Sequence, residues 1–168
     1  MIENVRGSKP APTTAEIQRV EAALDVKFNR EYVEFICRNN GGKPDENIYD
    51  IPPDNNSNIH GVIPLDELIY EHSLFEDRTG PHIIPVMFDG CGNFICMDMS
   101  GAGDGDIYFL DHEVPGREAL TLLAPSLDAF LDSVRPDDLE VSLAPGQGTV
   151  VWMHPDLQKI IDEQRKKK

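Results

Sequence analysis

The sequence predicts an α+β fold: one domain with a central, mostly antiparallel sheet formed by a strand meander, flanked by helices and followed by a C-terminal strand-helix extension. Three observations support this prediction. Two amphipathic helical patterns open the chain of 168 residues, short apolar strand patterns separated by glycine-rich turns fill its centre, and another helical pattern follows them. We expect a flexible lead at residues 1–12, the domain at 13–135 and the extension at 136–168.

The first helix is predicted to begin after Thr13. Thr13 and Glu16 match the capping box S/T-x-x-E, in which two side chains satisfy backbone amides at the start of a helix. Ile17, Val20 and Leu24 then recur at helical spacing. One face of this helix should therefore be buried.

The second helix is predicted to begin after Asn29, a residue type that favours the N-cap position. The side chains expected on its buried face are Phe28, Tyr32, Phe35, Ile36 and Asn39. Either Gly41 or Gly42 should supply the left-handed residue that ends the helix.

The polar stretch KPDENIYDIPPDNNSN, residues 43–58, reads as a loop that could hold one short strand in NIYDI. A short strand near Ile59–Ile63 and a helical segment from Leu65 to about His72 are predicted next. The sequence EDRTGP is expected to end that helical segment.

The centre of the chain predicts the meander. The segments IIPVMFD, NFICMDM and DIYFLDH are separated by GCG and SGAGDG, and the three-residue connection at 90–92 suits a hairpin. Because Pro85 cannot donate a ladder hydrogen bond, the first strand should begin at Val86 or lie at an edge there. Both faces of these strands are largely apolar, which predicts a sheet that is covered on both sides.

The last helix of the domain should begin after Ser126. Its apolar stripe consists of Leu127, Phe130, Leu131 and Val134. In the extension, a linker-like stretch precedes a short strand and a helix that has Pro155 in its first turn and a basic end at 165–168.

Charge is the strongest feature of the composition. Thirty Asp and Glu residues oppose fifteen Lys and Arg residues, for a net charge of −15. Such a surface repels nucleic acid and anionic membranes and attracts basic partners, although solubility alone would also account for it. We see no signal-peptide pattern, and no apolar run approaches the roughly 20 residues of a membrane span. We expect a cytoplasmic protein with no nucleic-acid and no membrane partner.

The glycine- and acid-rich residues 97–113 are the main candidate for chemistry. Counted from Asp98, this segment lacks two of the ligands that an EF-hand calcium loop requires. It is followed by a strand pattern, so no helix N-terminus is available to receive a phosphate. The glycines favour a tight hairpin turn over a ligand loop.

The other reactive side chains form no pattern typical of catalysis or metal binding. The five histidines are scattered, and the three cysteines lack the spacing of a zinc knuckle, which favours reduced thiols. A Cys–His pair assembled in space stays open, although Cys96 lies among apolar residues. We therefore expect a protein that is not an enzyme, with no catalytic residue, no cofactor and no metal.

Taken in order, these segments resemble the SUKH superfamily of Smi/Knr-like domains over about residues 13–134. The residues that carry the resemblance are Tyr32, Phe35, Asn40, Gly41, Gly42, Pro85, Asp89, Gly90, Gly92, Asp98, Asp111, His112, Phe130 and Leu131. Phe28 and Asn29 stand where the family often has Leu-Pro. Residues 136–168 lie outside the resemblance.

The resemblance implies a single α+β domain without known catalysis. Many bacterial members are immunity proteins that bind and neutralise toxins, often nucleases, whereas fungal members regulate cell-wall signalling through protein contacts. Together with the acidic charge, this predicts a non-catalytic immunity protein whose partner is a cognate protein toxin or another basic protein. A regulatory scaffold of the Smi/Knr type is the alternative, and a small hydrolase is a remote one.

The candidate partner-binding residues are acidic side chains in expected loops, where core packing does not fix their role. They are Asp45, Glu46, Asp50, Asp54, Asp104 and Asp106. For any one of them alone, a solvated surface charge is the simpler interpretation. A buried aromatic or aliphatic anchor, which the sequence does not identify, should carry more of the affinity.

Overall fold

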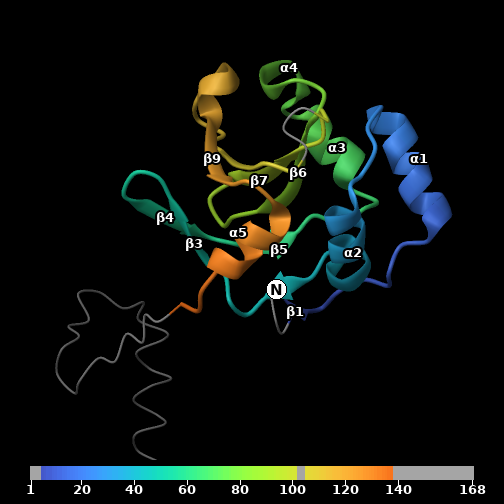
Figure 1. Cartoon of the computed structure of the whole chain (residues 1–168), viewed down its shortest axis with the longest axis horizontal. Coiled ribbons are helices and arrows are strands. Elements are labelled where there is room, and N and C mark those ends of the chain that lie inside the picture. The colour runs from blue at the N-terminus through green and yellow to red at the C-terminus, as the bar shows by residue number, and fades with distance from the viewer. Residues whose placement is uncertain (1–4, 102–104, 138–168) are drawn as a thin grey trace, which may run out of the picture. The chain divides into compact units, whose positions relative to one another are not determined.

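The centre of the fold is a five-stranded antiparallel sheet with the strand order β5-β6-β7-β8-β9 (Figure 1). Its strands are β5 (Gly61–Val62), β6 (Ile83–Phe88), β7 (Phe94–Asp98), β8 (Ile107–Leu110) and β9 (Leu120–Ala124). The computed structural model describes residues 5–101 and 105–137, and the expected extension lies outside them from residue 138 onward. The predicted α+β fold with a mostly antiparallel sheet is confirmed.

Two hairpins connect the middle strands. Between β6 and β7, the Asp89 carboxylate accepts hydrogen bonds from the backbone N of Cys91 and of Asn93, each at 2.8 Å, and thereby holds the turn. Between β7 and β8, the backbone N of Gly105 donates to the carbonyl of Asp98 at 2.9 Å. The glycine-rich segment is therefore the turn of a hairpin, as predicted.

Pro85 lies within β6, which begins at Ile83 and not at Val86. At Pro85 the strand pairs on one side only, with Cys96 of β7, because β5 pairs with Met87 and Phe88 alone. The expected position at a local edge is therefore confirmed, and the register shifts between Pro85 and Met87. A residue without an amide hydrogen is tolerated at such an open edge.

The predicted helix caps are confirmed. Helix α1 (Thr14–Leu24) has the full capping box, in which Thr13 and Glu16 bond reciprocally. Helix α2 (Arg30–Asn39) begins at Asn29, whose side chain accepts from the backbone N of Tyr32 at 2.9 Å. Helix α5 (Leu127–Ser133) begins at Ser126, whose hydroxyl accepts from the backbone N of Ala129 at 3.1 Å. Each cap is a local interaction, which is why the sequence reveals it.

The possible short strand in NIYDI is present as β3 (Ile48–Ile51), but several other short elements were not expected from the sequence. Residues 43–58 also form β2 (Lys43–Pro44) and β4 (Asn55–Asn58), and β4 pairs with β3 as a hairpin. Helix α3 (Leu68–Ser73) is followed by α4 (Glu76–Thr79), a short helix where the sequence predicted a break. A 3-10 turn, η1 (Gly116–Ala119), precedes β9, which also had no predicted counterpart.

Residues 5–12, which were expected to belong to a flexible lead, are joined to the domain by a short strand and a backbone hydrogen bond. Strand β1 (Val5–Arg6) pairs antiparallel with β2, and the backbone N of Lys9 donates to the carbonyl of Asn40 at 2.7 Å. Helix α2 ends at the left-handed Gly41, with φ of 70°. The next residue, Gly42, leaves the space that β1 fills, because a Cβ there would lie 2.3 Å from Cγ1 of Val5.

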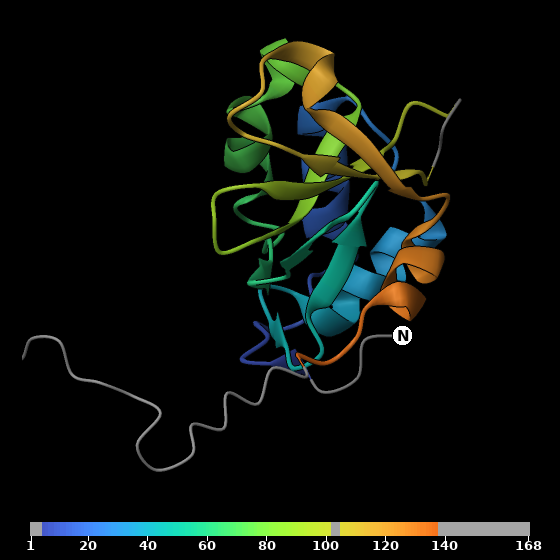
Figure 2. The same cartoon turned by 90° about the vertical axis from the view of Figure 1, so that its left-hand side faces the viewer.

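The sheet is covered on both faces, as predicted. On one face, Tyr49 of β3 packs against Phe109 of β8 and Phe130 of α5, with ring centroids 6.5 and 5.5 Å away. On the other face, Phe75, just before α4, packs against Phe94 of β7 at 4.6 Å. Figure 2 shows α3, in green, and α5, in orange, on opposite sides of the domain. Among the described helices, none combines the length and the apolar character needed to span a bilayer.

Candidate functional site

The structure places four of the six candidate acids on one stretch of the fold. Asp45 and Glu46 lie between β2 and β3, Asp50 lies on β3, and Asp54 lies in the turn to β4. We call these four residues the hairpin acids. Asp106 belongs to a different hairpin, before β8, where the hydroxyl of Tyr108 donates to its carboxylate at 3.5 Å. The remaining candidate, Asp104, lies outside the described residues.

Two of the hairpin acids are already paired with arginine. Arg6 of β1 lies 2.6 Å from the Asp45 carboxylate, and Arg135 lies 2.6 Å from that of Asp50. Both pairs are solvent-exposed, so each contributes little to stability but reduces the local negative charge. Asp54 makes no ion pair with any described Lys or Arg.

A cavity of about 430 Å³ lies at the tip of the β3–β4 hairpin. Asp50 and Asp54 both line it, together with proline and asparagine residues of the turn, with Leu123 of β9 and with Ser133 of α5. The hairpin therefore carries two carboxylates on one concave surface, which suits recognition of a basic group more than it suits a reaction.

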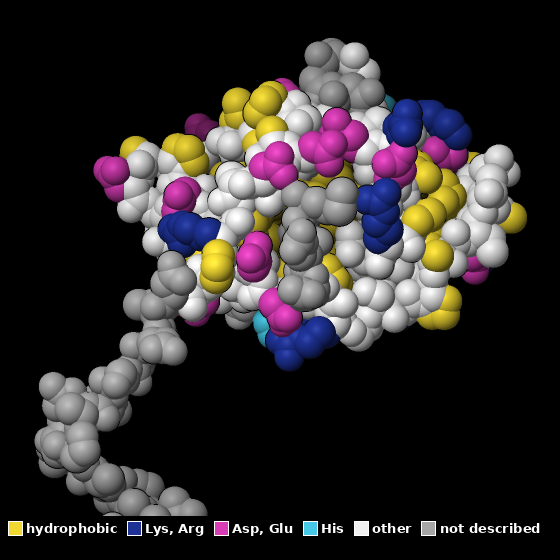
Figure 3. Space-filling view, turned by 60° about the horizontal axis from the view of Figure 1, so that its bottom comes forward, with side chains coloured by type: hydrophobic (Ala, Val, Ile, Leu, Met, Phe, Trp, Pro, Cys, Tyr) yellow, Lys and Arg dark blue, Asp and Glu magenta, His cyan; other side chains and the backbone are white. Residues whose placement is uncertain are grey.

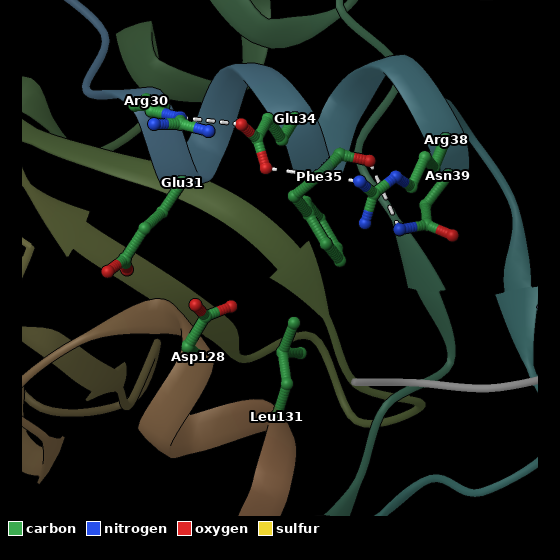
Figure 4. Close-up of a pocket in the computed structure, with 8 residues that line it drawn as sticks. All are labelled: Arg30, Glu31, Glu34, Phe35, Arg38, Asn39, Asp128 and Leu131. Carbon is green, nitrogen blue, oxygen red and sulfur yellow. Dashed lines mark hydrogen bonds and ion pairs between the residues drawn. The ribbon is translucent and has the colours of Figure 1, made fainter.

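A second cavity, of about 320 Å³, lies between α2 and α5 (Figure 4). Along α2, Arg30 Nε donates to Glu34 at 2.7 Å, and this hydrogen bond and charge lower the pKa of Glu34. Glu31 and Asp128 extend into the space between the two helices (Figure 4). Glu31 also accepts a hydrogen bond from the backbone N of Leu127 at 3.1 Å, so it fixes the start of α5.

Charge of both signs surrounds this cavity, because the arginine and glutamate side chains of α2 alternate at i and i+4. Figure 3 shows acidic side chains spread over one face of the molecule, with smaller groups of Lys and Arg beside them. On α2, the arginine side chains offset part of the negative charge of the neighbouring glutamates. The α2–α5 cavity is polar and salt-bridged, which favours a structural role for most of its charged groups.

Metal binding and thiol chemistry find little support among residues 5–101 and 105–137. No group of three or more His, Cys, Asp and Glu residues there could hold a metal ion. Burial raises the pKa of the Cys96 thiol, which makes its thiolate scarce. The ring Nδ1 of His112 bonds to Asn93 at 2.8 Å and is used to hold the β6–β7 turn.

The structure also reveals surface residues that the sequence analysis did not select. The described residues include four exposed large hydrophobic side chains, and three of them lie on or beside α3: Ile69, Tyr70 and Leu74. The sequence did carry a signal, since LIYEHSLF has more apolar residues than one helix face can bury. Which of them face outward depends on the side that packs against the sheet.

Comparison with known protein families gives one match. The model described as SMI1 / KNR4 family (SUKH-1) matches residues 11–133, which include the three predicted helix caps, the whole sheet and α5. A search of curated proteins found no match.

Several of the residues that carry the resemblance have structural roles. Tyr32 is fully buried, Asn40 bonds to two other segments, and Asp89 holds a turn.

Proposed function

Since the chain belongs to the SMI1 / KNR4 (SUKH-1) family, we propose that it is an immunity protein, which binds a basic protein toxin and blocks it without modifying it. Membership of this family supports a protein-binding role for the domain. The toxin, its neutralisation and the cytoplasmic setting are the parts that we add.

The observation that carries the proposal is the net charge of −15 of the full chain, most of which is a domain of this family. A toxin that cleaves nucleic acid needs a basic groove to hold phosphates. A strongly acidic partner is drawn toward such a groove at long range, and it can cover the groove once it is bound. The same charge would keep this chain away from nucleic acid.

We assign a steering role to the six candidate acids. Among the hairpin acids, Arg6 and Arg135 offset the charges of Asp45 and Asp50. Asp54 has no ion pair with a described Lys or Arg, so its charge is not offset in this way. Asp104 and Asp106 would act from the second hairpin. Exposed charges of this kind mostly affect the rate of association, so none of them alone should determine the affinity.

Co-expression tests this function. We expect a neighbouring gene to encode the toxin, whose toxic domain should kill a host cell that carries it alone, and the full-length chain should restore growth. A catalytically inactive toxin serves as the control for the burden of expression. Continued killing in the presence of soluble full-length chain would contradict the proposal. Binding to several unrelated proteins without rescue would favour a regulatory scaffold instead.

A further inference from the structure

Exposed apolar side chains are concentrated on α3. Tyr70 is 65% exposed, Leu74 48% and Ile69 40%, and the fourth exposed large hydrophobic side chain of the described residues, Leu122, lies on β9. Large apolar groups that stand together on a surface mark a contact site more often than isolated ones do. Figure 2 shows α3, in green, at one edge of the domain with no other element outside it.

Helix α3 has apolar side chains on both its inner and its outer side, as the helical spacing of residues 67–75 shows. The inner side packs on the sheet through Leu68, His72 and Phe75, all of them buried. Residues 67–74 keep helical backbone angles or hydrogen bonds, so side chains three or four positions apart are neighbours. On the outer side, Tyr70 therefore lies next to Leu74, and both lie next to acidic residues of the same helix.

Two glutamates border this apolar strip. Glu67 and Glu71 are one turn apart, and both line a cavity of about 240 Å³ whose other walls are apolar or glycine. The apolar walls come from Ile63, Pro64, Phe88 and Phe94. A carboxylate above an apolar floor suits the side chain of a lysine or arginine, whose hydrocarbon stem can pack while its charged end is paired.

The two glutamates differ in whether they already have a cation. Lys9 Nζ lies 3.1 Å from the Glu67 carboxylate and 3.0 Å from that of Asp66. Glu71 makes no ion pair with a Lys or Arg of the described residues, and it is half-buried. Burial, and next the nearby charge of Glu67, raise the pKa of Glu71. A cation from a partner would offset the repulsion from Glu67 and favour the ionised form of Glu71.

We propose that this strip is the contact face for the basic toxin, with Tyr70 as the apolar anchor and Glu71 as the acceptor for a lysine or arginine of the partner. We call the strip, which consists of Glu67, Tyr70, Glu71 and Leu74, the α3 surface. The inference rests on the proposed function and adds where the partner binds. Tyrosine is among the residues that most often dominate binding energy, and acids at its edge select for a basic partner.

Charge argues against the other occupants of the α3 surface. A second copy that docked through the same surface would bring Glu67 and Glu71 of both copies together, and like charges would then repel. An anionic membrane would be repelled by the same acids. A basic protein is the partner whose charge complements this surface.

The test uses the full-length chain and the purified toxin domain that, under the proposed function, a neighbouring gene is expected to encode, with binding kinetics measured at about 0.15 M salt. Tyr70→Ala should raise Kd at least about 30-fold, mainly through a faster koff. Glu71→Gln should raise Kd about 10-fold, and Glu67→Gln should raise it less because Lys9 already pairs with Glu67.

Two matched controls separate this surface from the rest of the molecule. Leu122→Ala removes an exposed apolar side chain from β9, and Glu113→Gln removes an exposed carboxylate from the turn after β8, a residue with no proposed part in binding. Each should change Kd by less than about threefold. All variants alter exposed or half-buried positions, and unchanged thermal unfolding midpoints should verify that they fold.

Hydrogen exchange on the unmutated chain provides a second readout that does not depend on the variants. Toxin binding should slow exchange in peptides that cover residues 67–75 and leave β9 unchanged. If the wild-type chain does not bind the toxin, the proposed function fails, and this inference fails with it.

Three other results overturn the α3 surface alone. The first is tight wild-type binding with Tyr70→Ala within threefold. The second is hydrogen exchange that toxin binding slows only outside residues 67–75. The third is a wild-type dimer that Tyr70→Ala disperses, which would identify a second copy as the occupant.

Discussion

Asn40 Oδ1 accepts a hydrogen bond of 2.9 Å from the backbone N of Leu65, and this bond ties the end of α2 to the segment that leads into α3. The amide nitrogen of the same side chain donates to the carbonyl of Pro10 at 2.9 Å. One buried side chain therefore joins three segments that are far apart in sequence. It also sets the position from which α3 begins.

Replacing this side chain should destabilise the domain. Asn40→Ala leaves buried partners without a hydrogen bond, so the free energy of unfolding should fall by about 1–3 kcal/mol. Urea unfolding measures it. Asn56→Ala, at an exposed position on β4, is the matched control and should change stability by less than about 0.5 kcal/mol. Equal effects of the two substitutions would show that the Asn40 bonds are not important.

Gly42→Ala should loosen the first strand. The added Cβ would lie 2.3 Å from Cγ1 of Val5 and 2.5 Å from the Ser8 hydroxyl, so β1 must move. We expect a loss of about 1–3 kcal/mol and faster amide exchange at residues 5–8. Gly90→Ala is the control, since its nearest neighbour would be Oδ1 of Asn58 at 3.7 Å. Unchanged exchange in Gly42→Ala would contradict the pairing of β1 with β2.

Acid should weaken the domain through His72. This residue is 3% exposed, and Nε2 has no hydrogen-bond partner among the described residues. Burial lowers its pKa below 6.5, although the charge of Glu76 opposes the shift. The unfolded chain therefore binds a proton more readily than the folded one, so the free energy of unfolding should fall as pH decreases below about 6.5.

Urea unfolding between pH 8 and 5 tests the role of this histidine. His72→Leu should remove the part of the decline that begins near pH 6.5, and above pH 7 the difference between variant and wild type should stay constant. An identical decline in both proteins would assign the pH dependence to other groups.

Reversing charge on the β3–β4 hairpin should slow association with the toxin. In the double variant Asp50→Lys with Asp54→Lys, kon should fall several-fold at low salt, and its dependence on salt should weaken. The value of koff should change little, because exposed charges act mainly before contact. Stopped-flow association at several salt concentrations measures this, with the exposed, uncharged change Asn56→Gln as the control. An unchanged kon would remove the steering role of the hairpin acids.

Local signals account for what the sequence predicts well. The caps at Thr13, Asn29 and Ser126 depend on neighbours three residues away, so each is readable without the fold. Strands β4 and β9 depend instead on pairing with the strand that precedes them. Residues 55–58 are Asn-Asn-Ser-Asn, a composition that disfavours strands, and they are extended because β3 pairs with them.

The proposed contact face likewise combines a feature that the sequence reveals with one that depends on packing. Charge is a property of composition, so the amino-acid sequence alone predicts a basic partner. The exposure of Tyr70 and Leu74 depends on which side of α3 packs on the sheet, and that packing comes from residues elsewhere in the chain. The sequence shows the surplus of apolar residues in this helix but not which of them stay outside.

The central claim is that the full-length chain blocks a basic toxin by binding to it and covering its groove, without modifying it. The most direct measurement uses the toxin domain that a neighbouring gene is expected to encode under the proposed function. Its activity is titrated with purified full-length chain, and the recovered toxin is then analysed by mass spectrometry. We expect complete inhibition at one equivalent, an unchanged toxin mass, and recovery of activity when the complex is dissociated. Full activity at several equivalents, or a covalently altered toxin after substoichiometric treatment, would contradict the claim.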